Sequence, residues 1–176
     1  MYIDSKTAEE NAVLNAAYAV CAAARTAPKA CGVDFMKTAV LTGADKDNVA
    51  AEMRRLSDES KSPILARDAD NVDKSTAVVL VGISDDRRGL GKICGLCHFD
   101  DCKACQAGNG CCVFSGIDLG IALGSAVALV TDLRIDNRIM VTIGKAAASL
   151  KLLGDTTLIM GIPMSVSGKS PYFDRK

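Results

Sequence analysis

The chain has 176 residues, of which 49% are hydrophobic and 24% charged, and its 21 basic residues balance its 21 acidic residues. This length and composition predict a single globular domain, 1–176, and argue against a disordered chain. Aromatic residues make up only 4% and Trp is absent, so neither the stacking platforms nor the basic face of a nucleic-acid-binding protein is expected.

The apolar segments predict no membrane contact. Residues 1–13 lack the basic start and apolar run of a secretory signal. The longest apolar stretch, 117–130, is shorter than the roughly 20 residues of a membrane span and contains Asp118, so it predicts a buried helix. We therefore expect a cytoplasmic protein, in a reducing compartment where stable disulfides are rare.

The first predicted element is a helix over 7–26. Thr7 is its expected N-cap, with Glu10 three residues on, and apolar residues recur at helical spacing. Pro28 and Gly32 follow it and end it.

Two strands and a surface helix come next. Residues 35–43 predict a strand, and residues 45–61 a surface helix with Asp at its start. Residues 75–84, STAVVLVGIS, form a short β-branched run that is typical of a strand buried on both faces.

The last third of the chain follows a Cys-rich loop. It predicts a helix from about Ser115, a second helix over 137–153 and a final strand over 156–163 that ends at Pro163. Helices that alternate with buried strands indicate an α/β or α+β sandwich.

The first of these helices carries small residues at steps of four: Gly116, Gly120, Gly124 and Ala128. This spacing clears one face of the helix, so another backbone can approach it closely. A tight helix crossing, either inside the core or at a dimer interface, is the favoured interpretation, because Gly inside a helix costs about 1 kcal/mol and usually has a packing reason.

Six of the eight cysteines lie in a predicted insertion over 91–112. Their spacing is C-x2-C-x4-C-x2-C-x5-C-C, at Cys94, Cys97, Cys102, Cys105, Cys111 and Cys112. Inert or disulfide-paired cysteines are the least favoured interpretation, because an intracellular loop seldom gathers so many. A structural zinc ion could take the first four, but the four-residue spacer between the two pairs is short for a zinc ribbon.

An iron–sulfur cluster is the favoured interpretation, with two choices of ligands. Cys97, Cys102 and Cys105 followed by a later Cys have the plant-type spacing of a two-iron cluster. Cys94, Cys97 and Cys102 with Cys111 or Cys112 would instead hold a four-iron cluster.

The other residues with metal-binding chemistry have simpler interpretations. His98, the only histidine, lies in the same loop and is expected beside the ligands or in solvent, because the cysteines already exceed the ligands needed. Cys21 stands among alanines and predicts a small buried apolar residue. Cys31 lies in the Pro/Gly break, closer to a candidate site.

Four segments stand out together: CGLCHFDDC, CVFSGIDLGIALGSAV, DNRIMVTIGKAA and the tail GIPMSVSGKSPYFDRK. They resemble an uncharacterised prokaryotic family described as ferredoxin-domain-containing proteins. The family pattern, C-G-x-C-G-x-x-x-C with a later Cys before the long helix, implies Cys94, Cys97, Cys102 and Cys112 as the ligands, with a four-iron cluster favoured over a two-iron cluster. Cys105 and Cys111 are additional and form a reserve, and His98 stands where the family often has Gly.

A second, weaker resemblance concerns the frame. The segment AARTAPKACGVD, the Gly-rich helix and the strand ending in GIP are similar in order to the flavin-binding nitroreductases. This resemblance implies an α+β sandwich, with a central sheet flanked by helices, and a homodimer that binds FMN. Pro28 matches the family's Pro-Ser-x-x-Asn-x-Gln stretch, but its Ser, Asn and Gln positions are replaced here. The remaining candidates for contact with an FMN or other phosphate are Lys29, Gly32, Lys169 and Arg175.

The sequence therefore predicts a cytoplasmic electron-transfer protein with a Cys-ligated iron–sulfur cluster. A zinc-stapled structural or interaction module is the alternative, and an FMN-dependent, nitroreductase-like oxidoreductase is a further one. No P-loop, G-x-G-x-x-G motif or nucleophile–base pair points to a nucleotide enzyme or a hydrolase. A redox protein is the expected partner, and the sequence does not identify it.

Overall fold

The computed structural model describes residues 1–154, 156 and 158–173. An antiparallel sheet of four strands forms its centre, in the order β1-β2-β4-β3. β1 (Met36–Leu41) pairs with β2 (Ala77–Ile83), β2 pairs with β4 (Leu158–Ser165), and the two residues of β3 (Asp136–Asn137) pair with the end of β4. All seven residues of β2 are buried, which confirms the predicted strand with two covered faces.

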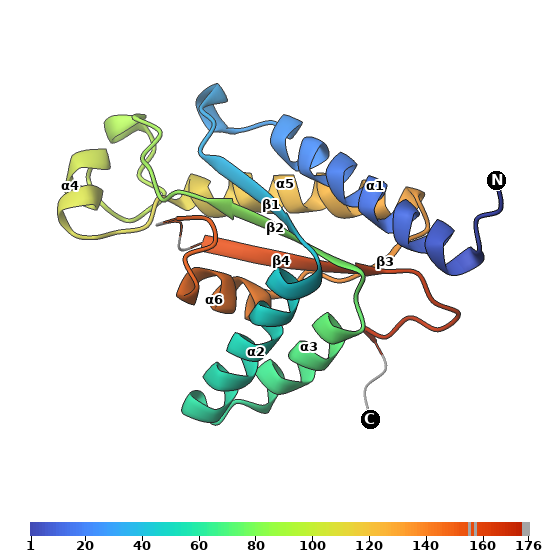
Figure 1. The fold of residues 1–176 in the computed structure, drawn as a ribbon. Coiled ribbons are helices and arrows are strands. Elements are labelled where there is room, and N and C mark those ends of the chain that lie inside the picture. The colour runs from blue at the N-terminus through green and yellow to red at the C-terminus, as the bar shows by residue number, and fades with distance from the viewer. Residues whose placement is uncertain (155, 157, 174–176) are drawn as a thin grey trace.

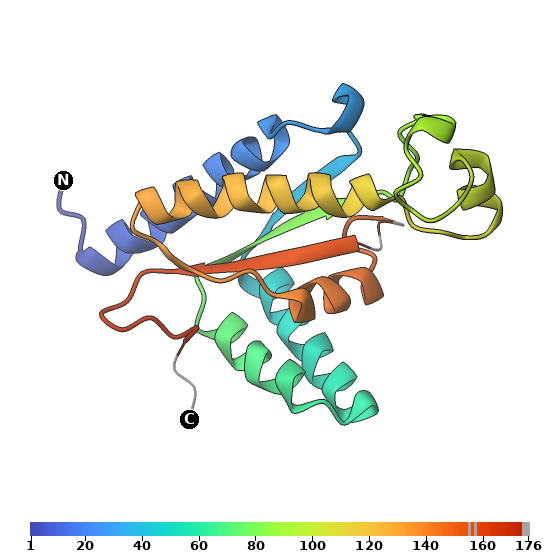
Figure 2. The ribbon, with the colours of Figure 1, turned by 180° about the vertical axis from the view of Figure 1, so that it is seen from behind.

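Helices cover both faces of this sheet, as Figures 1 and 2 show. On one face lie α1 (Ser5–Thr26) and α5 (Val113–Asp132). On the other lie α2 (Gly43–Ser60), α3 (Pro63–Asp73) and α6 (Val141–Ser149). The molecule is therefore the α+β sandwich that the sequence predicted.

Side chains of β2 alternate between two hydrophobic cores. Val79 and Val81 belong to the core beneath α1 and α5, whereas Val78 and Leu80 belong to the core beneath α2, α3 and α6. Successive side chains of a strand point to opposite faces, so one central strand organises both halves of the interior.

The Cys-rich loop leaves the sheet at the carboxyl end of β2 and returns at the start of α5. It contains a short 3-10 helix, η2 (Gly91–Ile93), and the helix α4 (Cys102–Ala107). The loop extends beyond one end of the sheet, at the left of Figure 1 and the right of Figure 2. A second short 3-10 helix, η1 (Ala30–Gly32), joins α1 to β1 at the same end.

Local details at both ends of the chain differ from the sequence prediction. Asp4, not Thr7, caps α1, because its carboxylate accepts hydrogen bonds from the Thr7 amide at 2.9 Å and from the Thr7 hydroxyl at 3.0 Å. The final strand does not end at Pro163 but continues to Ser165, where it pairs with β3.

Two of the helices also differ from the prediction. α6 is shorter than the predicted 137–153, because residues 136–137 are extended and pair with β4. No helix was predicted for residues 63–73, where α3 lies. Pro63 stands in the first turn of α3, a position that Pro favours.

The glycine face of α5 is open rather than packed. A Cβ atom built on Gly116, Gly120 or Gly124 meets no heavy atom within 4 Å, so the predicted tight crossing inside the core is wrong for this chain. With 20 residues and a mean hydropathy of 1.9, α5 has the length and composition of a membrane span. Its opposite face, which includes Leu119 and Ala126, lies in the core shared with α1 and the sheet.

The packing of α6 on β4 depends on two glycines. A Cβ atom on Gly144 would overlap the carbonyl group of Ile159, and one on Gly161 would overlap the side chain of Ile143. The absence of both side chains allows the helix backbone to lie directly on the strand, which accounts for the Gly in TIGKAA.

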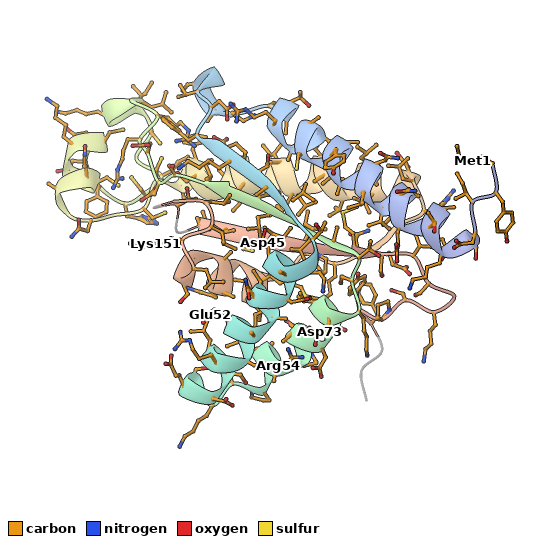
Figure 3. The ribbon with its side chains drawn as sticks, in the orientation of Figure 1. Met1, Asp45, Glu52, Arg54, Asp73 and Lys151 are labelled. Carbon is orange, nitrogen blue, oxygen red and sulfur yellow. The ribbon has the colours of Figure 1, made fainter. Side chains whose placement is uncertain are left out.

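Ion pairs hold the outer helices together (Figure 3). Arg54 on α2 donates to Asp70 at 2.8 Å and to Asp73 at 2.5 Å, and both carboxylates belong to α3. Glu52 accepts hydrogen bonds from Arg55 and from Ser149 of α6, and these bonds lower the pKa of the Glu52 carboxyl to about 2.

Replacing Gly144 with Ala is expected to destabilise the fold by about 1–3 kcal/mol, because the overlap with Ile159 outweighs the gain of about 1 kcal/mol in helix propensity. Urea denaturation measures the free energy of unfolding. Lys145→Ala, at the exposed neighbouring position, is the control and should change it by less than about 0.5 kcal/mol. Equal stability of the two variants would contradict the close contact between α6 and β4.

Candidate metal centre

Five of the six loop cysteines line one enclosed cavity: Cys94, Cys97, Cys102, Cys105 and Cys112. The rings of Phe99 and Phe114 complete much of its wall. The open space inside it is only about 10 Å³. The structure thus brings together the four ligands that the family resemblance implied, and adds Cys105 from the reserve.

Three separate segments supply these thiols. Cys94 and Cys97 lie in the irregular segment after η2, whereas Cys102 and Cys105 lie one turn apart on α4. Asp101 caps α4, since its carboxylate accepts the amide of Ala104 at 2.8 Å. Cys112 is the N-cap residue of α5.

The return of the loop toward α5 depends on Gly110. A Cβ atom there would approach Cys105 Sγ to 2.9 Å and would overlap the Phe99 ring. The Cys105 side chain is fully buried. Small residues at this turn therefore let the backbone close over the thiols.

Asp85, just after β2, fixes the position of Cys112. Its Oδ1 accepts hydrogen bonds from the Cys112 amide at 3.0 Å, the Ser115 hydroxyl at 3.3 Å and the Cys111 thiol at 3.5 Å. The first turn of α5 has no cap from its own N-cap side chain, and Asp85 satisfies donors there from another segment. Cys111 is exposed and lies outside the cavity wall.

Arg87 joins the two ends of the loop. Its Nη1 donates to the Asp85 carbonyl at 2.9 Å, and its Nη2 donates to the carbonyls of Gly110 and, at 3.5 Å, of Cys105. Arg87 also lines the cysteine cavity. Its Nε is buried and has no hydrogen-bond partner in the structure.

Arg88 forms a buried ion pair with Asp118 of α5. Its Nε and Nη2 donate to Asp118 Oδ2 at 3.2 and 2.8 Å, and both side chains are 1% exposed. The other Asp118 oxygen accepts the Ala30 amide at 3.0 Å, and Arg88 lies 4.8 Å from the centre of the Phe35 ring. One carboxylate therefore links the base of the loop to α5 and to η1.

Asp85, Arg87 and Arg88, which lie beside the cysteine cavity, were not among the site residues predicted from the sequence. The signal that could have found them is the run DDRR at 85–88, directly between a buried strand and the cysteines. Charged residues at the end of a buried strand need partners, and here the partners are the loop and α5.

Burial and close neighbours shift the pKa values of two thiols. Burial raises the pKa of the Cys105 thiol, and the adjacent Cys97 thiol raises it further, while the Arg87 guanidinium opposes both effects. Burial also raises the pKa of Cys111, and the neighbouring Asp85 carboxylate adds to the shift. The Cys97 thiol is therefore a direct neighbour of Cys105 at the cavity wall.

The five thiols line one cavity, but they are not arranged around one position that a metal ion could occupy. Among the residues that the structure describes, no three His, Cys, Asp or Glu side chains form a group that could hold one metal ion. A zinc ion needs four donors, with thiolates at about 2.3 Å. In an iron–sulfur cluster the thiolates bind different irons, and cysteine thiols, five of which line this cavity, are the donors that such a cluster uses.

All eight cysteines are free thiols, and the three other candidate residues with side-chain chemistry lie outside the cavity wall. His98 is exposed and has a positive φ of 60°. Cys31 is exposed on η1. Cys21 is partly buried beside the core of α1, where burial raises the pKa of its thiol.

The candidate phosphate contacts do not meet within one chain. Lys29 and Gly32 precede β1 at the end of the sheet that carries the Cys loop, whereas Lys169 follows β4 at the opposite end. The seven residues of β2 separate these ends by about 20 Å. The ammonium group of Lys29 donates to the carbonyls of Arg25 and Ala27 at the end of α1. Arg175 lies outside the described residues.

This chain is similar in sequence to one domain model and to one archaeal protein. Residues 108–175 match a domain model described as "Uncharacterized protein containing a ferredoxin domain". An uncharacterized protein of Archaeoglobus fulgidus is 40% identical over 183 residues, covering 99% of this chain and 98% of its relative. The matched span begins after Cys105, so the domain model includes only Cys111 and Cys112 of the loop cysteines.

Solved structures with a similar fold include FMN-dependent enzymes. The FMN-dependent nitroreductase of Mycobacterium smegmatis in complex with NADPH has a TM-score of 0.59 at 13% identity, over 88% of this chain and 78% of the enzyme. A nitroreductase of Lactococcus lactis in complex with nicotinic acid has a TM-score of 0.57 at 15% identity, over 96% and 81%.

The NADPH:FMN oxidoreductase of Vibrio harveyi, complexed with NAD+, also has a TM-score of 0.57, at 11% identity. Its match covers 92% of this chain but only 63% of the enzyme, just under two thirds. At these identities the likeness establishes the nitroreductase-like fold alone.

Asp85→Ala is expected to reduce the free energy of unfolding by about 1 kcal/mol, because three donors at the start of α5 lose their shared acceptor. Asp85→Asn keeps a side-chain carbonyl oxygen at this position, so its free energy of unfolding should fall by less than that of Asp85→Ala. Urea denaturation of the metal-free protein, with all thiols kept reduced, measures both. An equal loss in the two variants would show that the acceptor has no role in capping α5.

Proposed function

We propose an electron-transfer function, with an iron–sulfur cluster as the redox group, for this protein, which belongs to the family of uncharacterized proteins containing a ferredoxin domain. The convergence of five thiols on one small cavity is the observation that carries the proposal. A cluster bound there would take up and release single electrons. The family description supports this function.

Cys94, Cys97, Cys102 and Cys112 are the proposed ligands, and a four-iron cluster is favoured. Cys105 lies on the same cavity, beside the Cys97 thiol. We assign it as a neighbour of the ligands. Cys111 donates to Asp85 and is exposed, so it stays outside the set.

Residues around the proposed cluster site would stabilise the negative charge of thiolate ligands. Phe99 and Phe114 line the cavity, and an apolar wall of this kind strengthens electrostatic interactions beside it. Arg87 brings a fixed positive charge to the cavity wall. Asp85 orients the backbone at Cys112, so the last proposed ligand starts from a defined position. Free thiols throughout the chain support a cytoplasmic location.

The first test is metal and sulfide analysis of protein purified without oxygen. We expect about four irons and four acid-labile sulfides per chain, with visible absorbance. One zinc per chain, with no colour, would support the zinc-stapled module. A folded product without iron, after anaerobic reconstitution with iron and sulfide, would overturn the proposal.

Single Cys→Ser variants test the ligand set in the same assay. Substitution of Cys94, Cys97, Cys102 or Cys112 should remove most of the bound iron, because each variant lacks one thiolate. Cys105→Ser and Cys111→Ser are the matched controls from the same loop and should retain it. If Cys105→Ser loses its iron while one of the four other variants retains it, Cys105 is a ligand and the cysteine replaced in that variant is not.

An FMN-dependent oxidoreductase remains the second proposal, because the fold is nitroreductase-like. Flavin released on denaturation of the purified protein would support it. The residues favour the cluster: the Lys29 ammonium already binds carbonyls of α1, and Lys169 lies at the other end of the sheet.

We also propose that the protein is a homodimer that pairs through the open face of α5. This face carries exposed Ile117 and Ile121 beside the bare glycines, and no described residue packs against those glycines. A second copy would bury this apolar surface, and the glycines would allow the close approach of two helices.

Gly120→Leu is therefore expected to convert the dimer to a monomer, because a branched side chain would fill the open face. Sedimentation equilibrium measures the change in mass. Ala51→Leu, at an exposed position of α2, adds the same side chain elsewhere and should remain dimeric. A monomeric wild-type protein at micromolar concentration would refute the pairing.

A further inference from the structure

We infer that Arg87 donates its Nε–H to a sulfur atom of the metal centre and thereby raises the reduction potential of that centre. This inference rests on the proposed iron–sulfur function and names a residue that adjusts it. Arg87 is a positioning and charge-compensating residue here, not a ligand.

The guanidinium group of Arg87 is held in place by backbone acceptors. Nη1 donates to the Asp85 carbonyl at 2.9 Å, and Nη2 donates to the carbonyls of Gly110 and Cys105. These bonds involve the start and the end of the loop, so the planar group has a defined orientation. The side chain is 18% exposed.

The remaining donor, Nε–H, has no acceptor in the structure although it is buried. Only a small minority of buried donors in proteins lack a partner, and a bound ion or water often satisfies those that do. Arg87 lines the same cavity as the five thiols and interacts electrostatically with Cys105 and Cys112. Sulfur atoms in this cavity are therefore the acceptors that its chemistry offers.

Arg88 provides an internal comparison. Its Nε and Nη2 are both satisfied by Asp118. Arg87 also has a carboxylate neighbour, because Asp85 Oδ2 lies 3.5 Å from its Nη1, but its Nε has no acceptor. Of the two neighbouring arginines, Arg87 is thus the one with a donor to spare for the cavity.

The effect on potential follows from charge. One electron supplied by a reductant such as dithionite adds one negative charge to the centre, while Arg87 keeps its proton and no bond is broken. A fixed cation and an N–H donor stabilise the reduced form more than the oxidised form. Loss of this donor should therefore shift the potential to a more negative value.

Redox titration of the reconstituted protein, followed by visible absorbance and electron paramagnetic resonance, measures this shift. In Arg87→Gln we expect at least a tenfold change in the equilibrium against the reduced form, which is about 59 mV for one electron. Arg87→Lys keeps the charge but not the planar fork, so its shift should be smaller. Lys103→Gln removes an exposed charge from the same loop and is the matched control.

Iron content and the thermal unfolding of each metal-free variant are measured beside the potential. Full iron content with equal potentials in Arg87→Gln and Lys103→Gln overturns the inference and leaves the proposed function intact. A wild-type protein that binds no iron overturns both.

A second measurement on the wild-type protein does not depend on the folding of any variant. The protein is labelled with 15N-arginine, reduced, and studied by pulsed electron paramagnetic resonance. A hyperfine coupling from one arginine nitrogen is expected, and its absence overturns the inference even where Arg87→Gln fails to fold.

Discussion

The buried ion pair between Arg88 and Asp118 is the constraint on which the candidate site depends. It joins Arg88, in the segment that follows β2, to the second turn of α5 at 2.8 Å, and both side chains are buried. The loop over 84–112 thus leaves and returns at one fixed place. Removal of either partner would leave a buried charge uncompensated, at a cost of about 3–5 kcal/mol, and would release the loop ends together. Asp118 also accepts the Ala30 amide, so the same pair positions the turn before β1.

Beyond this anchor, the loop has little apolar material of its own. The two large cores lie over the sheet and contain mainly aliphatic side chains from β2, β4 and the helices. Phe99 and Phe114 are the only aromatic residues in the loop and the first turn of α5. A segment with so small a core generally needs a staple, such as a metal. The free thiols are the proposed ligands, and the Asp101 cap of α4 supplies part of the local order; metal binding to such ligands generally contributes to the folding free energy.

The sequence was most informative where one local signal dominated. The β-branched run 75–84 and the cysteine spacing predicted β2 and the common cavity, because burial and ligand chemistry each leave a dense pattern. The small-residue stripe of α5 did not reveal whether its partner lies inside or outside the chain, since both use the same spacing. Thr7 and Asp4 are both good caps, and the choice depended on where the helix began. The Arg87 and Arg88 contacts could not be predicted, because their partners lie up to 30 residues away.

Some solved structures with the same fold are FMN-dependent enzymes. The residues at the end of the sheet differ in what they could bind in this chain. Fold alone does not determine function; the residues of the site do. Here Lys29 and Lys169 lie at opposite ends of β2, and Lys29 is engaged by the end of α1. The end of the sheet that carries Lys29 also carries five converging thiols, two arginines and a buried carboxylate. Buried polar groups are costly unless they have partners, and in this chain they are concentrated around the cysteine sulfur atoms rather than around a phosphate site.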